Sequence, residues 1–257
     1  MKRAREIRPR SGTTPNKFPN RQLCQARYVT RSILSTQPAI YLPFARRKYR
    51  AIDGRVVGAD ADIVIEGFQR SGNTFSVFAF ELAQEPERVK VIHHLHAAAQ
   101  VVAAVRKGLP TVVLIRDPKE SVLSHMVREP CITTRQAIAH WIRFYGTVLP
   151  YRDKVVMADF SEITTDFGQV IRRVNKRFGR SFQEFEHTKA NTERVFELTE
   201  ERNRGLHGRV DERYVARPSI ERQAMKDRLQ ASFDAPQTAR LRDRAYRIYH
   251  QLVDQSA

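Results

Sequence analysis

Residues 62–75 read DIVIEGFQRSGNTF and constrain the fold more than any other part of this 257-residue chain. The β-branched run Ile63–Ile65 is typical of a buried parallel strand, and the apolar stretch 74–82 is typical of a helix. The short loop between them holds Gly67 and Gly72, five positions apart. Such a loop turns backbone N–H groups toward one point, where the helix dipole adds positive charge. The segment therefore predicts an anion site on a strand–loop–helix unit.

This loop lacks the lysine of a triphosphate-binding loop. Kinases and nucleoside triphosphatases with this glycine spacing place Lys after the second glycine and then Ser or Thr, whereas Asn73 and Thr74 follow it here. Arg70 supplies a cation earlier in the loop. We expect the loop to bind a single phosphate through its amides, Arg70, Ser71 and Thr74. A glycine turn that only joins a strand to a helix is the alternative.

A second motif, TVVLIRDPKESVLSH, covers residues 111–125. Its apolar strand ends in Arg116, at the carboxyl edge where open α/β sheets bind ligands, and Ser124 follows eight residues later in a predicted helix. A guanidinium group can donate two parallel hydrogen bonds to a phosphate. The motif therefore predicts a second phosphate contact. An ion pair of Arg116 with Asp117 or Glu120 is the alternative.

The remaining chain continues the alternation of short apolar runs and helical patterns. This alternation predicts an α/β fold, a mostly parallel sheet with helices on both faces. The further segments are strands at 89–92 and 155–157 and helices at 97–106, 134–149, 167–178 and 241–252.

Taken together, the two motifs resemble the sulfotransferases that use 3′-phosphoadenosine 5′-phosphosulfate (PAPS), in their bacterial-type branch. The resemblance spans roughly residues 62–208 and implies a P-loop nucleoside-triphosphatase-like sulfotransferase fold. It implies transfer of a sulfuryl group from PAPS to a hydroxyl or amine, with no metal. It also implies that Arg70 stabilises the leaving phosphate and that Phe75 lies near adenine. The donor-binding residues it assigns are Arg70, Ser71, Gly72, Asn73, Thr74, Phe75, Arg116 and Ser124, with a basic-Gly turn at Arg204 and Gly205.

The general base implied by the resemblance is a histidine in the segment VIHHLHAAAQ. We choose His94, because it precedes leucine and lies 22 residues before Arg116. His93 and His96 are the alternative bases, and ordinary core or capping histidines are the structural alternative. A lysine expected two residues earlier is replaced by Ile92. A free imidazole titrates near ~6.5 and can accept a proton at neutral pH.

Two other functions use the same observations. A P-loop phosphoryl transferase would need magnesium, for which Asp159 is the nearest candidate ligand. A non-enzymatic basic module would only bind anions. The acceptor of a sulfotransferase could be a small molecule, a carbohydrate or a lipid, and we expect no specific nucleic acid.

The charge is concentrated at the start of the chain. Residues 1–50 hold thirteen Lys and Arg against one acid, Glu6, and so carry +12 of the net +17. Five prolines lie among the first 43 residues. We expect a basic, Pro-interrupted arm over 1–50 and an α/β domain over 51–257. A solvated tail, an anionic membrane surface contacted beside Tyr41, Leu42 and Phe44, and an organellar transit peptide are the alternatives for the arm.

The two cysteines, Cys24 and Cys131, lack zinc-knuckle spacing and cannot form a multi-disulfide scaffold. No apolar run approaches the ~18 residues of a membrane span, and no secretory signal is visible. We expect a cytoplasmic protein in a reducing compartment, with peripheral membrane contact or an organellar address as alternatives.

Overall fold

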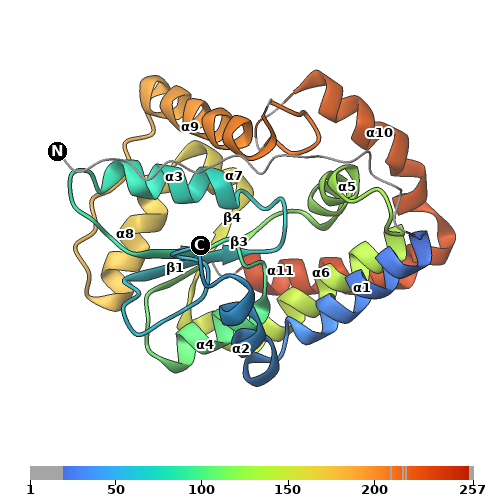
Figure 1. Cartoon of the computed structure of the whole chain (residues 1–257), viewed down its shortest axis with the longest axis horizontal. Helices are drawn as coiled ribbons and strands as arrows, with labels where there is room; N and C mark the ends of the chain where they lie inside the picture. Colours follow the sequence, from blue (N-terminus) through green and yellow to red (C-terminus); the bar gives the residue numbers. More distant parts are fainter. Residues whose placement is uncertain (1–19, 209, 216, 218, 255–257) are drawn as a thin grey trace.

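A four-stranded parallel sheet forms the centre of the computed structural model, which describes residues 20–208, 210–215, 217 and 219–254 (Figure 1). The strand order is β2-β1-β3-β4, and Ile65 of β1 is in register with His93 of β2 and Val112 of β3. The predicted parallel α/β fold is therefore confirmed. The strands are β1 (Ile63–Gly67), β2 (Val91–His93), β3 (Thr111–Ile115) and β4 (Val156–Asp159).

Helices cover both faces of the sheet (Figure 1). In β3, Val112 packs with the cluster under α3 and α8, whereas Val113 packs with the cluster under α5 and α6. Successive strand side chains point to opposite faces, so a strand buried on both faces needs a continuous apolar run. The α-helices of the described part are α1 (Arg21–Leu34), α2 (Pro38–Lys48), α3 (Asn73–Ala83), α4 (Ala98–Arg106), α5 (Pro118–Arg128), α6 (Thr134–Val148), α7 (Phe160–Thr165), α8 (Phe167–Phe178), α9 (Lys189–His207), α10 (Ile220–Asp234) and α11 (Ala239–Val253), with 3₁₀ turns at Leu149–Lys154 and Pro236–Thr238.

The two glycines of the anion loop have different tasks. A Cβ atom on Gly67 would lie 2.5 Å from the Leu114 carbonyl oxygen, so only glycine allows β1 and β3 to approach this closely. Gly72 has φ of 92° and forms the N-cap of α3. This left-handed conformation is one that glycine adopts at no steric cost. Together they let the chain leave β1 and enter α3 within five residues.

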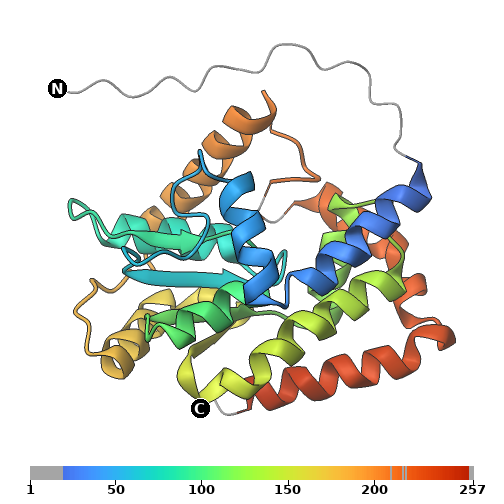
Figure 2. The ribbon, with the colours of Figure 1, turned by 60° about the horizontal axis from the view of Figure 1, so that its bottom comes forward.

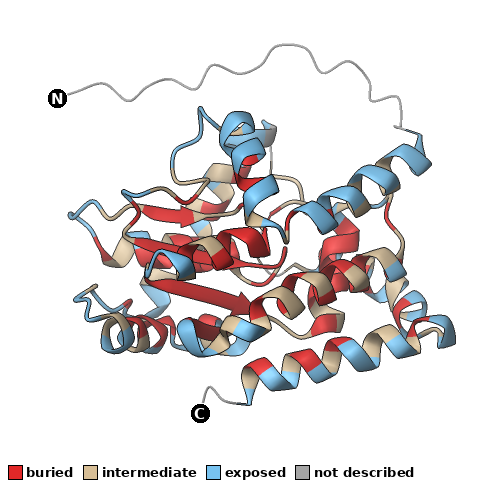
Figure 3. Cartoon of the chain, turned by 90° about the horizontal axis from the view of Figure 1, so that it is seen from below, coloured by how far each residue is buried: buried red, intermediate tan, exposed pale blue. Residues whose placement is uncertain are grey.

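The basic N-terminal segment is part of the domain from residue 21 onward, which corrects the expected boundary at residue 50. Helix α1 lies along α6 (Figure 2), where the Tyr28 hydroxyl bonds His140 Nδ1 at 2.9 Å and Arg143 donates to Ser32 Oγ at 3.0 Å. In α2, Tyr41 and Leu42 are buried in a cluster with Val64 of β1 and Ile92 of β2. Buried residues fill the sheet and the inward faces of the surrounding helices (Figure 3). Residues 1–19 lie outside the described part of the chain.

Burial of Tyr41 and Leu42 also removes most of the apolar surface expected to face a membrane, although Phe44 is 61% exposed. Within the described ranges, no helix combines the length and apolar character needed to cross a membrane. A disulfide joins Cys24 of α1 to Cys131, with Cα atoms 6.4 Å apart. The expectation of a reducing compartment does not anticipate this bridge, because disulfides persist mainly in oxidising compartments.

Candidate functional site

The two predicted motifs meet in a cavity of about 740 Å³ at the carboxyl end of the sheet. Its walls come from the loop after β1, the end of β3, α5, α7 and α10. Parallel strands deliver the loops that follow them to one edge, which is why motifs 46 residues apart lie side by side. The predicted residues that line the cavity are Arg70, Gly72, Asn73, Thr74, Phe75, His94, Arg116 and Ser124.

Asn73 and Ser71 make side-chain hydrogen bonds that stabilise the loop. The Asn73 amide donates to the Phe68 carbonyl oxygen across the loop at 3.0 Å. Ser71 Oγ lies 3.2 Å from the Tyr145 hydroxyl, and Tyr145 in turn donates to the Leu114 carbonyl oxygen at 2.7 Å. Ser71 is fully buried and does not line the cavity, so its expected side-chain contact with phosphate is wrong.

The backbone of the loop brings the N-terminus of α3 to the cavity. Helix α3 begins at Asn73, and the first N–H groups of an α-helix have no acceptor within the helix. Gly72 through Phe75 line the cavity, so this positive helix end opens into it. The loop can therefore hold one phosphate group without a lysine.

Ser124 is the centre of a second cation cluster on the same cavity wall. Its Oγ accepts from Arg70 Nε at 3.1 Å and from Arg222 Nη2 at 3.0 Å. A guanidinium group donates and never accepts, and a hydroxyl oxygen has two lone pairs and one hydrogen. Both lone pairs are occupied here, so the Ser124 hydroxyl hydrogen remains to be donated to an anion.

Arg116 joins this cluster from the end of β3. Its Nη1 donates to the Arg70 carbonyl oxygen at 3.3 Å, and its Nη2 donates to Glu120 Oε2 at 3.1 Å. The guanidinium lies 4.0 Å from the centre of the Phe160 ring. The ion pair with Glu120 that the sequence left as an alternative does form, but Lys226 shares the same carboxylate oxygen at 2.6 Å. The Glu120 carboxylate therefore forms ion pairs with two cations, Arg116 and Lys226.

Burial and mutual repulsion destabilise the charged forms of these groups. Burial lowers the pKa of Arg70 well below its usual value, and the charges of Arg222, Arg128 and Arg116 lower it further. Burial, then Arg116 and Arg128, lowers the pKa of Arg222 to about 10. A multiply charged anion in the cavity would relieve this repulsion, so the cluster is suited to a phosphate group.

The basic-Gly turn expected at Arg204 and Gly205 does not reach this cavity. Both residues are exposed on α9 and neither lines it. The late element that does reach the cavity is α10: Arg222 contacts Ser124, and Lys226, one turn further on, bonds Glu120. Sequence reasoning missed both. Their spacing of four residues on one helix face was the available signal, but Arg and Lys are common in this chain.

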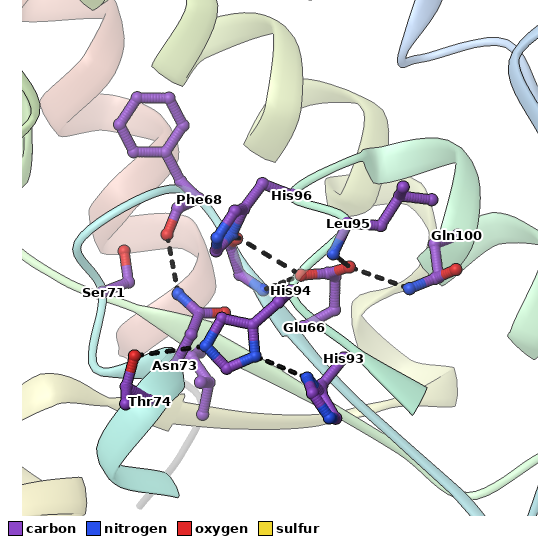
Figure 4. A network of polar contacts seen from close by, with 12 residues as sticks. Glu66, Phe68, Ser71, Asn73, Thr74, His93, His94, Leu95, His96 and Gln100 are labelled. Carbon is purple, nitrogen blue, oxygen red and sulfur yellow. Dashed lines mark hydrogen bonds and ion pairs between the residues drawn. The ribbon is translucent and has the colours of Figure 1, made fainter. Parts of the chain in front are cut away.

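Glu66 organises the histidine segment that follows β2 (Figure 4). Its buried carboxylate accepts from the Leu95 backbone N–H at 3.0 Å, from Gln100 Nε2 at 2.9 Å and from the Gly67 N–H at 3.3 Å. Burial raises its pKa to about 7, against the lowering effect of these hydrogen bonds. His94, with φ of 59°, is held in a left-handed conformation that favours glycine. Glu66 thus fixes a turn that the local sequence would not adopt unaided.

The neighbours of His94 determine which of its nitrogens carries the lone pair. Arg202 Nη1 lies 3.3 Å from Nε2 and can only donate, so Nε2 is the unprotonated nitrogen. Thr74 Oγ1 also lies 3.1 Å from Nε2, and Nδ1 faces His93. Burial, and next the charge of Arg202, lowers the pKa of His94 well below its usual value. His94 is therefore a neutral imidazole whose Nε2 lone pair, beside the loop, accepts from Arg202 in this structure.

His96 presents a second such nitrogen. Its Nδ1 lies 2.9 Å from the Gly67 carbonyl oxygen, to which it must donate, and Glu66 Oε1 lies 3.7 Å away. This arrangement leaves the lone pair on Nε2. Burial lowers the pKa of His96 to about 3. The structure thus brings both His94 and His96 to the cavity, whereas His93 does not line it.

A second cavity of about 480 Å³ adjoins the first on the other side of the histidines. The residues that line both are Gln69, Thr74, His94, His96 and Arg128. His94 therefore lies where two spaces meet, the first of which is also lined by Arg70 and the N-terminus of α3. Two cavities that meet at a base are an arrangement suited to transfer of a group between two bound molecules.

Asp159, the candidate magnesium ligand, has its oxygens engaged. Oδ1 caps α7 by accepting from the Ser161 N–H at 2.9 Å, and Oδ2 accepts from the Tyr249 hydroxyl at 2.8 Å. The residue does not line the anion cavity. Among the described residues, no three His, Cys, Asp or Glu are grouped as metal ligands.

No protein-family model matches the sequence, and no curated protein matches it. Among solved structures, the chain is similar to the mouse sulfotransferase SULT7A1 in complex with PAP, with a TM-score of 0.40 and 13% sequence identity. The match covers 77% of this chain and 94% of the mouse chain.

Proposed function

We propose that this protein is a sulfotransferase that moves a sulfuryl group from PAPS to an acceptor hydroxyl or amine. The observation that carries the proposal is the presence of two separate anion sites in one cavity. The first is the N-terminal turn of α3, and the second is the cluster of Arg116, Ser124 and Arg222. A nucleotide with phosphate groups at both its 5′ and 3′ positions needs two such sites, whereas a triphosphate needs one extended site with a metal.

The residues of the cavity fit the parts of PAPS. The N–H groups of α3 suit the 5′-phosphosulfate, and the free hydroxyl hydrogen of Ser124 with Arg116 and Arg222 suits the 3′-phosphate. The rings of Phe75 and Phe160 line the same cavity and offer apolar surface to adenine. PAPS would supply a sulfuryl group activated by its bond to phosphate.

His94 is the base in this proposal. Nε2 takes the proton of the acceptor hydroxyl while the acceptor oxygen forms a bond to sulfur. The bond between sulfur and the 5′-phosphate oxygen breaks, and its electron pair remains on that oxygen. The α3 N-terminus faces the charge that grows there and stabilises the transition state. The products are a sulfated acceptor, adenosine 3′,5′-bisphosphate and a proton on His94.

A transfer assay tests this function. The purified chain is incubated with radiolabelled PAPS and a panel of phenol, sugar and amine acceptors, without magnesium. We expect labelled acceptor to form, and His94→Ala to lower the rate by ~10²–10⁴ while adenosine 3′,5′-bisphosphate still binds. His250→Ala, on the remote helix α11, is the matched control and should leave the rate unchanged. Phosphoryl transfer from ATP with magnesium, and none from PAPS, would contradict the proposal.

A further inference from the structure

The second cavity, on the far side of His94, is lined by arginines from four separate parts of the chain. Helix α1 contributes two, the loop before β1 contributes one, and α5 and α9 contribute one each. Glu129 is the one acidic side chain among its described lining residues. The arginines are Arg27, Arg31, Arg55, Arg128 and Arg202.

These arginines form no ion pairs among the described residues, although the charge of Glu129 contributes to the raised pKa of Arg31. Within the part of the chain that the structure describes, none of the five has a carboxylate within ion-pair distance. Arg31 instead donates to the Tyr41 hydroxyl at 3.3 Å and the Leu95 carbonyl oxygen at 3.4 Å, and Arg55 donates to the His94 carbonyl oxygen. Arg27 is exposed to the cavity. Burial, and next the charge of Arg55, lowers the pKa of Arg202, and a bound anion would relieve this repulsion.

The histidines of the second cavity add no positive charge to that of the arginines. Burial, and next the nearby charges of Arg31 and Arg143, lower the pKa of His140 to about 3. His94 and His96 are neutral for the same physical reason. The positive character of the cavity therefore comes from guanidinium groups, which remain charged at any physiological pH.

The first cavity, which is proposed to bind the sulfuryl donor, has cations of its own. The two sets of arginines therefore serve different ligands. Arg70, Arg116 and Arg222 surround Ser124 and do not line the second cavity, whereas Arg27 and Arg31 line the second cavity and not the first. A neutral phenol or alcohol would leave the second set uncompensated. The chemistry of the wall is that of a site for carboxylate, sulfate or phosphate groups.

We propose that the acceptor is itself an anion, a hydroxyl compound that carries a second group of the carboxylate, sulfate or phosphate type. This inference rests on the proposed sulfotransferase function. The acceptor hydroxyl would lie at His94, where the two cavities meet, and the anionic group would lie against Arg27 and Arg31 of α1. Helix α1 is then part of the acceptor site.

The test uses 4-hydroxybenzoate and its neutral analogue of nearly the same shape, 4-hydroxybenzamide. Calorimetry measures their binding to the full chain saturated with adenosine 3′,5′-bisphosphate, which keeps the probes out of the donor cavity. The variants are Arg27→Gln, Arg27→Lys and, on the same helix but outside the cavity, Arg21→Gln as control. Arg27 makes no hydrogen bond or ion pair within the described part of the chain, so the fold of Arg27→Gln should survive, and thermal melting checks this.

We expect the benzoate to bind at least tenfold more tightly than the benzamide, as a charge-assisted hydrogen bond allows. Arg27→Gln should remove most of that preference, Arg27→Lys should restore part of it, and Arg21→Gln should leave it intact. Equal binding of both probes, a preference unchanged by Arg27→Gln, or benzoate binding weaker than about 1 mM would overturn the inference. Failure of adenosine 3′,5′-bisphosphate to bind would instead overturn the sulfotransferase proposal, and the saturation step reports that separately.

Discussion

Arg222 Nη2 donates both to Ser124 Oγ at 3.0 Å and to the Ser124 carbonyl oxygen at 2.8 Å. This contact joins α10 to α5 across 98 residues of sequence. The other guanidinium nitrogen, Nη1, donates to the carbonyl oxygens of Glu212 and Arg213, each at 2.8 Å. One buried side chain thus connects the late loop of the chain to the second anion site.

Arg222→Met should reduce the advantage of adenosine 3′,5′-bisphosphate over adenosine 5′-phosphate by about ten- to a hundredfold, because a hydrogen bond to a charged group contributes ~1.5–3 kcal/mol. Titration calorimetry with both nucleotides measures the ratio. Arg228→Met, exposed on the same helix, is the control. Equal losses for both nucleotides would mean that Arg222 only stabilises the loop.

Arg70→Ala should weaken binding of adenosine 3′,5′-bisphosphate and also lower the transfer rate. The family resemblance implied that Arg70 acts chiefly in the transition state, but its guanidinium lies against Ser124. An interaction made equally in ground and transition states changes binding, whereas one made only in the transition state changes the rate. Comparison of Kd with the single-turnover rate separates the two. A reduced rate with unchanged Kd would contradict the placement seen here.

The contrast between Arg116 and Arg222 shows how far the sequence could predict this site. Arg116 follows a five-residue apolar strand, and the carboxyl end of such a strand is a known place for ligands, so its position was predictable. Arg222 reaches Ser124 only through the packing of α10 on α5, which no local pattern encodes. No local pattern predicts the packing of α1 either, because its contacts with His125 and His140 join residues about a hundred positions apart. The charge of this segment predicted an arm instead.

Deletion of residues 1–40 should destabilise the domain rather than release a separable tail. The cut removes α1, its disulfide and the Tyr28 hydroxyl bonds to His125 and His140. A bridge that closes a loop of about a hundred residues contributes up to ~4.7 kcal/mol in the chain-entropy description. A loss of 1 kcal/mol lowers the melting temperature of a protein this size by roughly 2–4 °C. We expect a fall of about 10 °C or more, measured by circular dichroism.

Deletion of residues 1–19 is the matched control for that truncation. It removes six of the basic residues and leaves every described contact in place. We expect its melting temperature to stay within a few degrees of the full chain. Equal melting of both truncated proteins would contradict a structural role for α1.

The pH profile of kcat/KM should have no acid limb near pH 6.5. This profile reports the free enzyme, in which burial, Arg202, His93, His96 and Arg55 all lower the pKa of His94. A base with a lowered pKa keeps its accepting form until the pH falls below that value, so the rate should stay level from pH 8 to well below 6.5. Glu66, whose pKa is about 7, positions the turn and lines neither cavity.

Arg202→Gln tests whether the charge of Arg202 lowers the pKa of His94. Removal of this cation should raise the pKa of His94 and move the acid limb to higher pH. Arg204→Gln, exposed two residues further along α9, is the control and should leave the profile unchanged. An acid limb that stays in place in Arg202→Gln would assign the base to His96, which Arg202 does not contact.

The most direct test of the central claim is the affinity of the full chain for adenosine 3′,5′-bisphosphate, adenosine 5′-phosphate and ATP, each with and without magnesium, before and after Arg116→Ala. The two anion sites predict that the bisphosphate binds most tightly and without magnesium. They also predict that Arg116→Ala reduces its advantage over adenosine 5′-phosphate by about ten- to a hundredfold. Tighter binding of ATP, dependent on magnesium and indifferent to Arg116, would contradict the account.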